Sequence, residues 1–209
     1  MRTLVFVLLA ALTAPCARAA DVEVALRTAK GQPVPNAVVT YAPQASHDAG
    51  GVRFDWPYRM AQQNLQFDPF VLVVPVGATV AFPNRDTVRH QVYSFSPAHP
   101  FELKLYSRDE TRTVRFDRVG VIALGCNIHD SMVGFIKVVD TPFAAKTDSQ
   151  GQAVLHGLPA GAGTLSIWHP YMKAPGNQLS SLVTLPREGL VRRAETADVR
   201  SPPIRHNSY

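Results

Sequence analysis

The stretch LGCNIHDSMVGFI, residues 124–136, decides how this chain is interpreted. It places Cys126, His129 and Met132 at intervals of three residues inside an otherwise apolar run. VGVIAL precedes the polar turn and VGFIKVV follows it, and both runs have the composition of β-strands. The three side chains therefore fall at the end of one strand, in a turn and at the start of the next strand. Such a turn can direct all three at one point.

The three side chains share a preference for transition metals. Thiolate, imidazole and thioether are soft to borderline donors, and with one more imidazole they suit copper. His90 offers that imidazole, because it begins a β-run after the polar loop of AFPNRDTVRHQVYSF. We expect one copper ion, with His90, Cys126 and His129 in a near-trigonal plane and Met132 as a weak axial ligand. Two His and one Cys also suit zinc, so the residues alone leave the metal open.

The first 19 residues have the pattern of a secretory signal peptide. Arg2 gives a positive start, residues 4–14 are apolar, and residues 17–19 read Ala-Arg-Ala, a cleavage site. The apolar run is too short to cross a membrane as a helix, and no later run is long enough. We therefore expect an exported, soluble protein in a bacterial periplasm.

Cysteine content and charge limit the function classes. Cys16 lies in the expected signal peptide, so only one of the two cysteines, Cys126, remains after cleavage. A lone exposed thiol is a liability in an oxidising compartment, which implies that Cys126 is buried or engaged in chemistry. Cleavage also removes two arginines and lowers the net charge from +5 to +3. With no concentrated basic run before the tail, nucleic acid is not an expected partner.

The rest of the chain predicts an all-β protein. No long segment has helical periodicity, and seventeen prolines argue against helices. The expected strands are short, rich in Val, Ile, Phe and Tyr, and separated by turn residues; they cover 21–28, 37–43, 70–76, 79–82, 90–96, 101–107, 112–117, 119–124 and 134–140. This spacing is typical of β-sandwiches.

Residues 60–140 resemble the small blue-copper cupredoxins. C-x2-H-x2-M is the ligand-loop spacing of amicyanin, and F-x-N-x5-H, with Phe82, Asn84 and His90, matches the first-ligand region of the same proteins. The whole chain is similar to exported cupredoxin-like proteins often labelled methylamine utilisation proteins. The resemblance implies a Greek-key β-sandwich, a type 1 copper site and electron transfer to a redox protein such as a dehydrogenase or cytochrome.

The ligand loops depart from the cupredoxin pattern at several positions. Gln91 stands where these proteins usually have Asn, and Ile128 where they usually have Pro. Asp130 and Ser131 follow His129, where an apolar docking patch is usual. Asp130 also keeps open a carboxylate-influenced, red-copper-like site.

The segments on either side resemble a second, smaller sandwich. Residues 22–39 look like the first strands, and residues 146–168 like the later strands, of a carboxypeptidase-regulatory-like (transthyretin-like) domain. Gly163 stands where that family often has Tyr, which would leave the second core under-packed. We expect 20–44 and 141–185 to form this domain around the cupredoxin region, with a connector at 45–59 and a flexible tail at 186–209. We also expect Trp168 to close a core and the adjacent His169 to be exposed.

The expected function is a periplasmic type 1 copper protein that carries single electrons. No general base, nucleophile or open coordination position is evident, so the sequence predicts no enzyme. Two alternatives stay open: a copper carrier or chaperone, and a red-copper-like site that binds small ligands.

Overall fold

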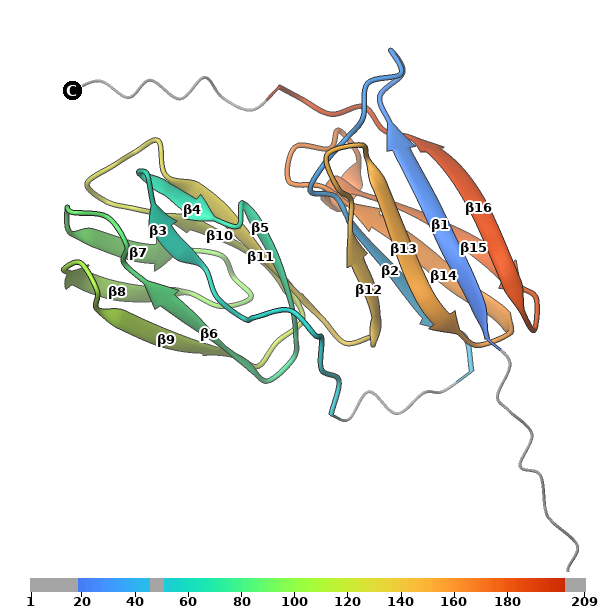
Figure 1. The fold of residues 1–209 in the computed structure, drawn as a ribbon, viewed down its shortest axis with the longest axis horizontal. Coiled ribbons are helices and arrows are strands. Elements are labelled where there is room, and N and C mark those ends of the chain that lie inside the picture. Colours follow the sequence, from blue (N-terminus) through green and yellow to red (C-terminus); the bar gives the residue numbers. More distant parts are fainter. Residues whose placement is uncertain (1–18, 46–50, 202–209) are drawn as a thin grey trace, which may run out of the picture.

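Two β-sandwiches lie side by side in the computed structural model, which describes residues 19–45 and 51–201 (Figure 1). The expected signal peptide lies outside the described residues except for its last one. Nearly all of the regular structure is β, so the all-β fold class is confirmed. Among the described residues, no helix has the length and apolar character needed to cross a membrane.

The central sandwich is formed by residues 61–139. Its strands are β3 (Ala61–Gln63), β4 (Gln66–Asp68), β5 (Val71–Pro75), β6 (Ala78–Pro83), β7 (His90–Ser94), β8 (Phe101–Tyr106), β9 (Thr111–Phe116), β10 (Gly120–Gly125) and β11 (Val133–Val139). The main sheet has the order β5-β11-β10-β7-β8, and β6 pairs with β9. Alternating residues of these strands, such as Val80, Phe82, Ile122 and Ile136, fill the core between the layers.

The flanking sandwich is formed by strands from both ends of the described chain. Its strands are β1 (Ala20–Arg27), β2 (Val38–Pro43), β12 (Phe143–Lys146), β13 (Gln152–Leu158), β14 (Gly161–Trp168), β15 (Gln178–Leu185) and β16 (Gly189–Thr196). One sheet has the order β13-β1-β16 and the other β12-β2-β14-β15. Among the described residues, the two strands that precede the central sandwich therefore pair with strands that follow it.

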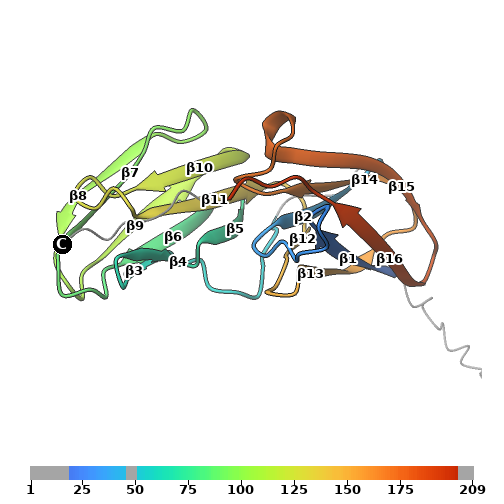
Figure 2. The same cartoon turned by 90° about the horizontal axis from the view of Figure 1, so that it is seen from above.

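The two sandwiches meet at an apolar seam, and Figure 2 shows from above how they adjoin. Val38 and Trp168 of the flanking sandwich pack with Val71, Val73 and Val139 of the central one. At the edge of the seam, the ammonium of Lys146 donates to the carbonyl oxygen of Val71 at 3.0 Å. This continuous packing fixes the central sandwich against its neighbour.

The connector contributes to the same seam. Residues 46–50 lie outside the described residues, but Phe54 and Trp56 stack at 4.4 Å between ring centroids. The indole N–H of Trp56 donates to the carbonyl oxygen of Val73 at 2.8 Å. The second half of the expected connector is thus packed against the central sandwich.

The expected flexible tail is wrong for residues 189–196. These residues form β16, which pairs in parallel with β1 along its whole length, from Ala20 opposite Gly189 to Arg27 opposite Thr196. The pairing uses backbone hydrogen bonds of a strand that is distant in sequence, so weakly apolar side chains suffice at this sheet edge. Residues 202–209 lie outside the described residues.

The expected gap at Gly163 is filled by a neighbouring strand. A Cβ atom at Gly163 would lie 2.3 Å from the ring of Tyr41, which is fully buried. Tyr41 on β2 occupies the space that a larger side chain on β14 would need. The core is therefore fully packed here, because the large Tyr41 on one strand fills the space beside the small Gly163 on the adjacent strand.

Candidate metal centre

His90 is held at the start of β7, on the inner face of the main sheet. It is fully buried, and its backbone is opposite Tyr106 of β8. The alternation along β7 buries His90, Val92 and Ser94 and leaves the residues between them more exposed. The imidazole is therefore directed inward by the same pattern that builds the core.

The loop between β10 and β11 carries the three other side chains that the sequence proposes as ligands, Cys126, His129 and Met132. The N–H of His129 donates to the carbonyl oxygen of Cys126 at 3.3 Å, and the N–H of Met132 donates to that of His129 at 2.9 Å. Each of these hydrogen bonds closes a turn between residues three apart, which is the spacing of Cys126, His129 and Met132 in the sequence. Cys126 and Met132 are buried, whereas His129 is half-buried.

Three of the predicted ligand atoms converge. The sulfur of Cys126 lies 3.7 Å from Nδ1 of His90 and 3.7 Å from Nδ1 of His129. Among the His, Cys, Asp and Glu residues of the described chain, these three form the group able to hold a metal ion, with all ligand atoms within 4.8 Å of one another.

The separations between the sulfur and the two nitrogens match those expected around a bound metal ion. Bonds of about 2.3 Å to sulfur and about 2.0 Å to nitrogen, typical of a first-row metal, separate S and N by about 3.7 Å at a trigonal angle. The observed separations agree with that value. The donor set of two imidazoles, one thiol and the buried thioether of Met132 fits a single type 1 copper ion.

Hydrogen bonding prepares the thiol of Cys126 for metal binding. Burial alone raises its pKa, but hydrogen bonds from His90, from the backbone N–H groups of Gln91 and Ile128, and from His129 lower it to about 6. Since a metal binds the thiolate, this environment favours the ligating form at neutral pH. Donors to a thiolate sulfur also tune the potential of a copper–thiolate site.

Asp86 holds the other side of the His90 ring. Its Oδ2 lies 2.8 Å from Nε2 of His90, so Nε2–H donates to the carboxylate and Nδ1 faces Cys126. Although burial alone lowers the pKa of His90, its contacts with Cys126 and Asp86 raise it overall. A carboxylate on the far nitrogen is the usual support of a metal-binding histidine.

The sequence interpretation missed Asp86. Acidic residues are common in polar loops such as NRDTVRH, so composition does not distinguish this one. The available signal was its position four residues before His90, which places it within reach of the ring when the loop curls back. Asn84 produces that curl, because its side chain donates to the carbonyl oxygens of Val88 and Tyr106 and accepts from the N–H of Asp86.

The departures from the cupredoxin pattern have separate outcomes. The side chain of Gln91 bonds to Glu102 on β8 rather than to the second ligand loop, while its backbone N–H reaches the sulfur of Cys126. Asp130 is exposed and is not one of the converging groups. The structure therefore gives no carboxylate ligand from this loop.

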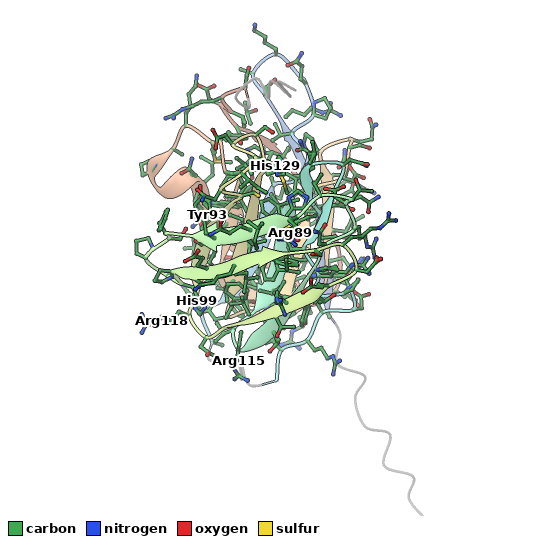
Figure 3. The ribbon with its side chains drawn as sticks, turned by 90° about the vertical axis from the view of Figure 1, so that its left-hand side faces the viewer. Arg89, Tyr93, His99, Arg115, Arg118 and His129 are labelled. Atoms are coloured by element: carbon green, nitrogen blue, oxygen red, sulfur yellow. The ribbon has the colours of Figure 1, made fainter. Side chains whose placement is uncertain are left out.

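One end of the central sandwich carries the metal centre. Figure 3 looks onto this end and shows His129 near the top of the view, with Arg89 and Tyr93 below it. Each ligand loop also exposes an apolar side chain, Val88 two residues before His90 and Ile128 directly before His129. The half-buried His129 thus lies on a loop that also presents an apolar side chain to solvent.

No protein-family model and no curated protein matches the chain. Many solved structures match it over part of its length. A purple cupredoxin from Nitrosopumilus maritimus is 22% identical, covers 39% of this chain and 98% of its own, and has a TM-score of 0.36. A reduced Cu(I) form of an amicyanin mutant is 19% identical and covers 48% of this chain and 98% of its own, with a TM-score of 0.38. These similar structures are cupredoxins, whereas the methylamine utilisation label rests on sequence resemblance alone.

The comparisons correct the expectation that the chain is not an enzyme. A copper-containing nitrite reductase from Thermus scotoductus SA-01 is 25% identical, covers 56% of this chain, and has a TM-score of 0.38. Cupredoxin-like similarity therefore extends to a copper enzyme, and the exclusion of catalysis is withdrawn. The match covers only 28% of that enzyme's chain, so it does not assign an activity to this one.

Proposed function

We propose that this protein is a periplasmic type 1 copper protein that carries single electrons between redox partners. The observation that carries the proposal is the convergence of His90, Cys126 and His129, at 3.7 Å from sulfur to each nitrogen, inside a rigid sandwich. When bound, copper would supply a one-electron couple between Cu(II) and Cu(I). His90, Cys126, His129 and Met132 would hold it.

The surroundings of these residues suit electron transfer. Ligands fixed by strands and by hydrogen bonds to Asp86 and to backbone N–H groups change position little between two oxidation states, which keeps reorganisation small. His129 is half-buried next to the exposed Ile128, so a partner can approach the metal centre through that edge. A dehydrogenase or cytochrome is the class of partner that would exchange single electrons there.

The burial of the ligands disfavours the role of a copper carrier. His90 is fully buried and Cys126 and Met132 are nearly so, which slows the handover of a metal ion to another protein. A carrier that releases copper readily would need ligands open to its acceptor. The alternative of a small-ligand site loses its support because Asp130 is not among the converging groups.

We also propose that the central sandwich is an insertion in the flanking one. The support is the strand pairing, in which β1 and β2 pair with β12, β13, β14 and β16. Insertion at a loop is tolerated when the ends of the inserted domain lie close together. Secretion with cleavage of the amino-terminal signal peptide completes the proposal, and it would leave Cys126, the free cysteine among the described residues, as the cysteine of the mature chain.

Protein-film voltammetry of the copper-loaded protein tests the proposed function. An electron carrier gives a reversible one-electron wave that persists over repeated cycles, because the ligands retain the metal in both oxidation states. Loss of the wave within a few cycles, with copper released into the buffer, would favour the carrier alternative. The variant Asp109→Asn, which removes an exposed carboxylate of the β8–β9 turn, is the matched control and should behave as the wild type.

A further inference from the structure

A cavity lies beside the seam, and none of the proposed copper ligands lines it. It has a volume of about 480 Å³. The loop between β1 and β2, the loop after β14 and the last described residues form its walls. This volume is within the range of small-molecule sites in proteins.

The walls of this cavity are mostly apolar and flat. Pro33 and Pro35 come from the β1–β2 loop, and Phe70 comes from the residue that precedes β5 of the central sandwich. Phe70 is fixed by ring contacts with Phe135 and Tyr171, with centroids 5.5 and 6.1 Å away. Two proline rings and a fixed aromatic ring present surfaces that a planar apolar group can cover.

His169 supplies a hydrogen-bond donor that lines the same cavity. The sequence led us to expect an exposed side chain, but His169 is only 6% exposed. Its Nδ1 accepts the backbone N–H of Tyr171 at 3.2 Å, so the ring proton resides on Nε2. Burial lowers the pKa of this imidazole to about 4, which keeps the ring neutral at physiological pH.

Within residues 19–45 and 51–201, the buried side-chain polar atoms without a hydrogen-bond partner include the hydroxyl of Tyr171, which lines the same cavity as His169. Buried hydroxyl groups are normally hydrogen-bonded, and one that is not signals a missing partner. A ligand that brings an oxygen atom into the cavity would provide it.

The mouth of the cavity carries a positive charge. Arg200 is the charged residue among the described residues that line it, and no carboxylate lines it. The backbone N–H of Arg200 donates to the carbonyl oxygen of Tyr171 at 2.9 Å, which fixes the backbone of Arg200 beside the cavity. Its side chain is exposed. A ligand that carries a single negative charge complements this mouth.

We propose that this cavity binds a compact aromatic monocarboxylate, with its ring against Pro33, Pro35 and Phe70 and its carboxylate on His169 Nε2–H and the Arg200 guanidinium. The apolar walls select the ring, and the two donors select the carboxylate. The site is independent of copper, since it shares no residue with the metal centre.

Titration of the reduced full-length protein with sodium benzoate tests the proposal. We expect saturable binding with a Kd on the order of 1 mM, the range for a ligand of this size. In ¹⁵N-histidine NMR spectra, the Nε2 resonance of His169 should shift with the same Kd, whereas that of the exposed His156 should not. Arg200→Gln should weaken benzoate binding about tenfold, because it removes a charge-assisted bond.

Two controls make the result decisive. Arg187→Gln, at an exposed arginine outside the cavity, should bind benzoate as the wild type does. Benzamide, which keeps the ring but carries no charge, should bind the wild type and Arg200→Gln equally. The proposal is overturned if benzoate binding does not saturate, if His169 does not respond, or if Arg200→Gln and Arg187→Gln bind benzoate alike.

Discussion

The carboxylate of Asp86 is the support whose removal we expect to affect the metal centre most. It lies 2.8 Å from Nε2 of His90 and also accepts the backbone N–H groups of Asn64 and Leu65 at 2.6 and 3.0 Å. Those two residues form the turn between β3 and β4 with φ angles of 55° and 54°, a left-handed conformation that is unusual for leucine. One carboxylate thus holds both the ligand ring and a strained turn.

Asp86→Asn keeps the shape of this side chain and removes its charge. A hydrogen bond to a charged group contributes about 1.5–3 kcal/mol and a neutral one about 1 kcal/mol. Weakening three such bonds, and turning an amide N–H₂ toward a donor, should lower the free energy of unfolding by about 2–4 kcal/mol. Loss of a carboxylate behind a ligating histidine should reduce copper affinity about 10- to 100-fold.

The assay is a competition titration of Cu(I) against a chelator, together with chemical unfolding of the copper-free protein. Asp109→Asn is the matched control, because Asp109 is exposed and pairs only loosely with Arg108 at 3.8 Å. We expect this control to change stability by less than about 0.5 kcal/mol and to leave the affinity unchanged. If Asp86→Asn bound copper within about twofold of the wild type, the supporting role of Asp86 would be refuted.

Three other predictions concern single residues. In the copper-free protein, alkylation of Cys126 by iodoacetamide should follow a titration with a midpoint near pH 6, the thiolate reacting above it; a midpoint near the ordinary value of about 8.5 would contradict the hydrogen-bond network described for the sulfur. Met132→Leu should raise the reduction potential measured by voltammetry, because the thioether stabilises Cu(II); an unchanged potential would mean that Met132 is not an axial ligand. Gly163→Ala should lower the free energy of unfolding by about 1–3 kcal/mol in urea denaturation, because its Cβ would collide with Tyr41; the paired change Gly163→Ala with Tyr41→Phe should retain most of this cost, since the ring remains.

Much of the fold followed from local patterns in the sequence. Strands such as Val71–Pro75 and Val133–Val139 are continuous or alternating apolar runs between turn residues, and they form where these patterns predict. The spacing of Cys126 and His129 was sufficient to bring their ligand atoms together, because the turn that joins them is local. Met132 follows in the same loop and is buried. His90 joined them because alternation along β7 fixes which of its residues point inward.

The features that the sequence did not reveal depend on distant partners. β16 forms because the edge of β1 is available for pairing, which its own weakly apolar residues do not indicate. Asp86 can support the metal centre only because the chain folds so that its carboxylate meets the ring of His90 and the backbone N–H of Asn64, which lies more than 20 residues earlier. His169 is buried because the loop after β14 folds under residues 198–200, a contact between segments about 30 residues apart.

The most direct test of the central claim is the visible absorption spectrum of the exported protein after addition of one equivalent of Cu(II). The proposed site predicts an intense thiolate-to-copper band that saturates at one equivalent and is absent from Cys126→Ser, while Asp130→Asn retains it. A weak band, or an intense band that persists in Cys126→Ser, would contradict the assignment of His90, Cys126, His129 and Met132 as a type 1 copper site.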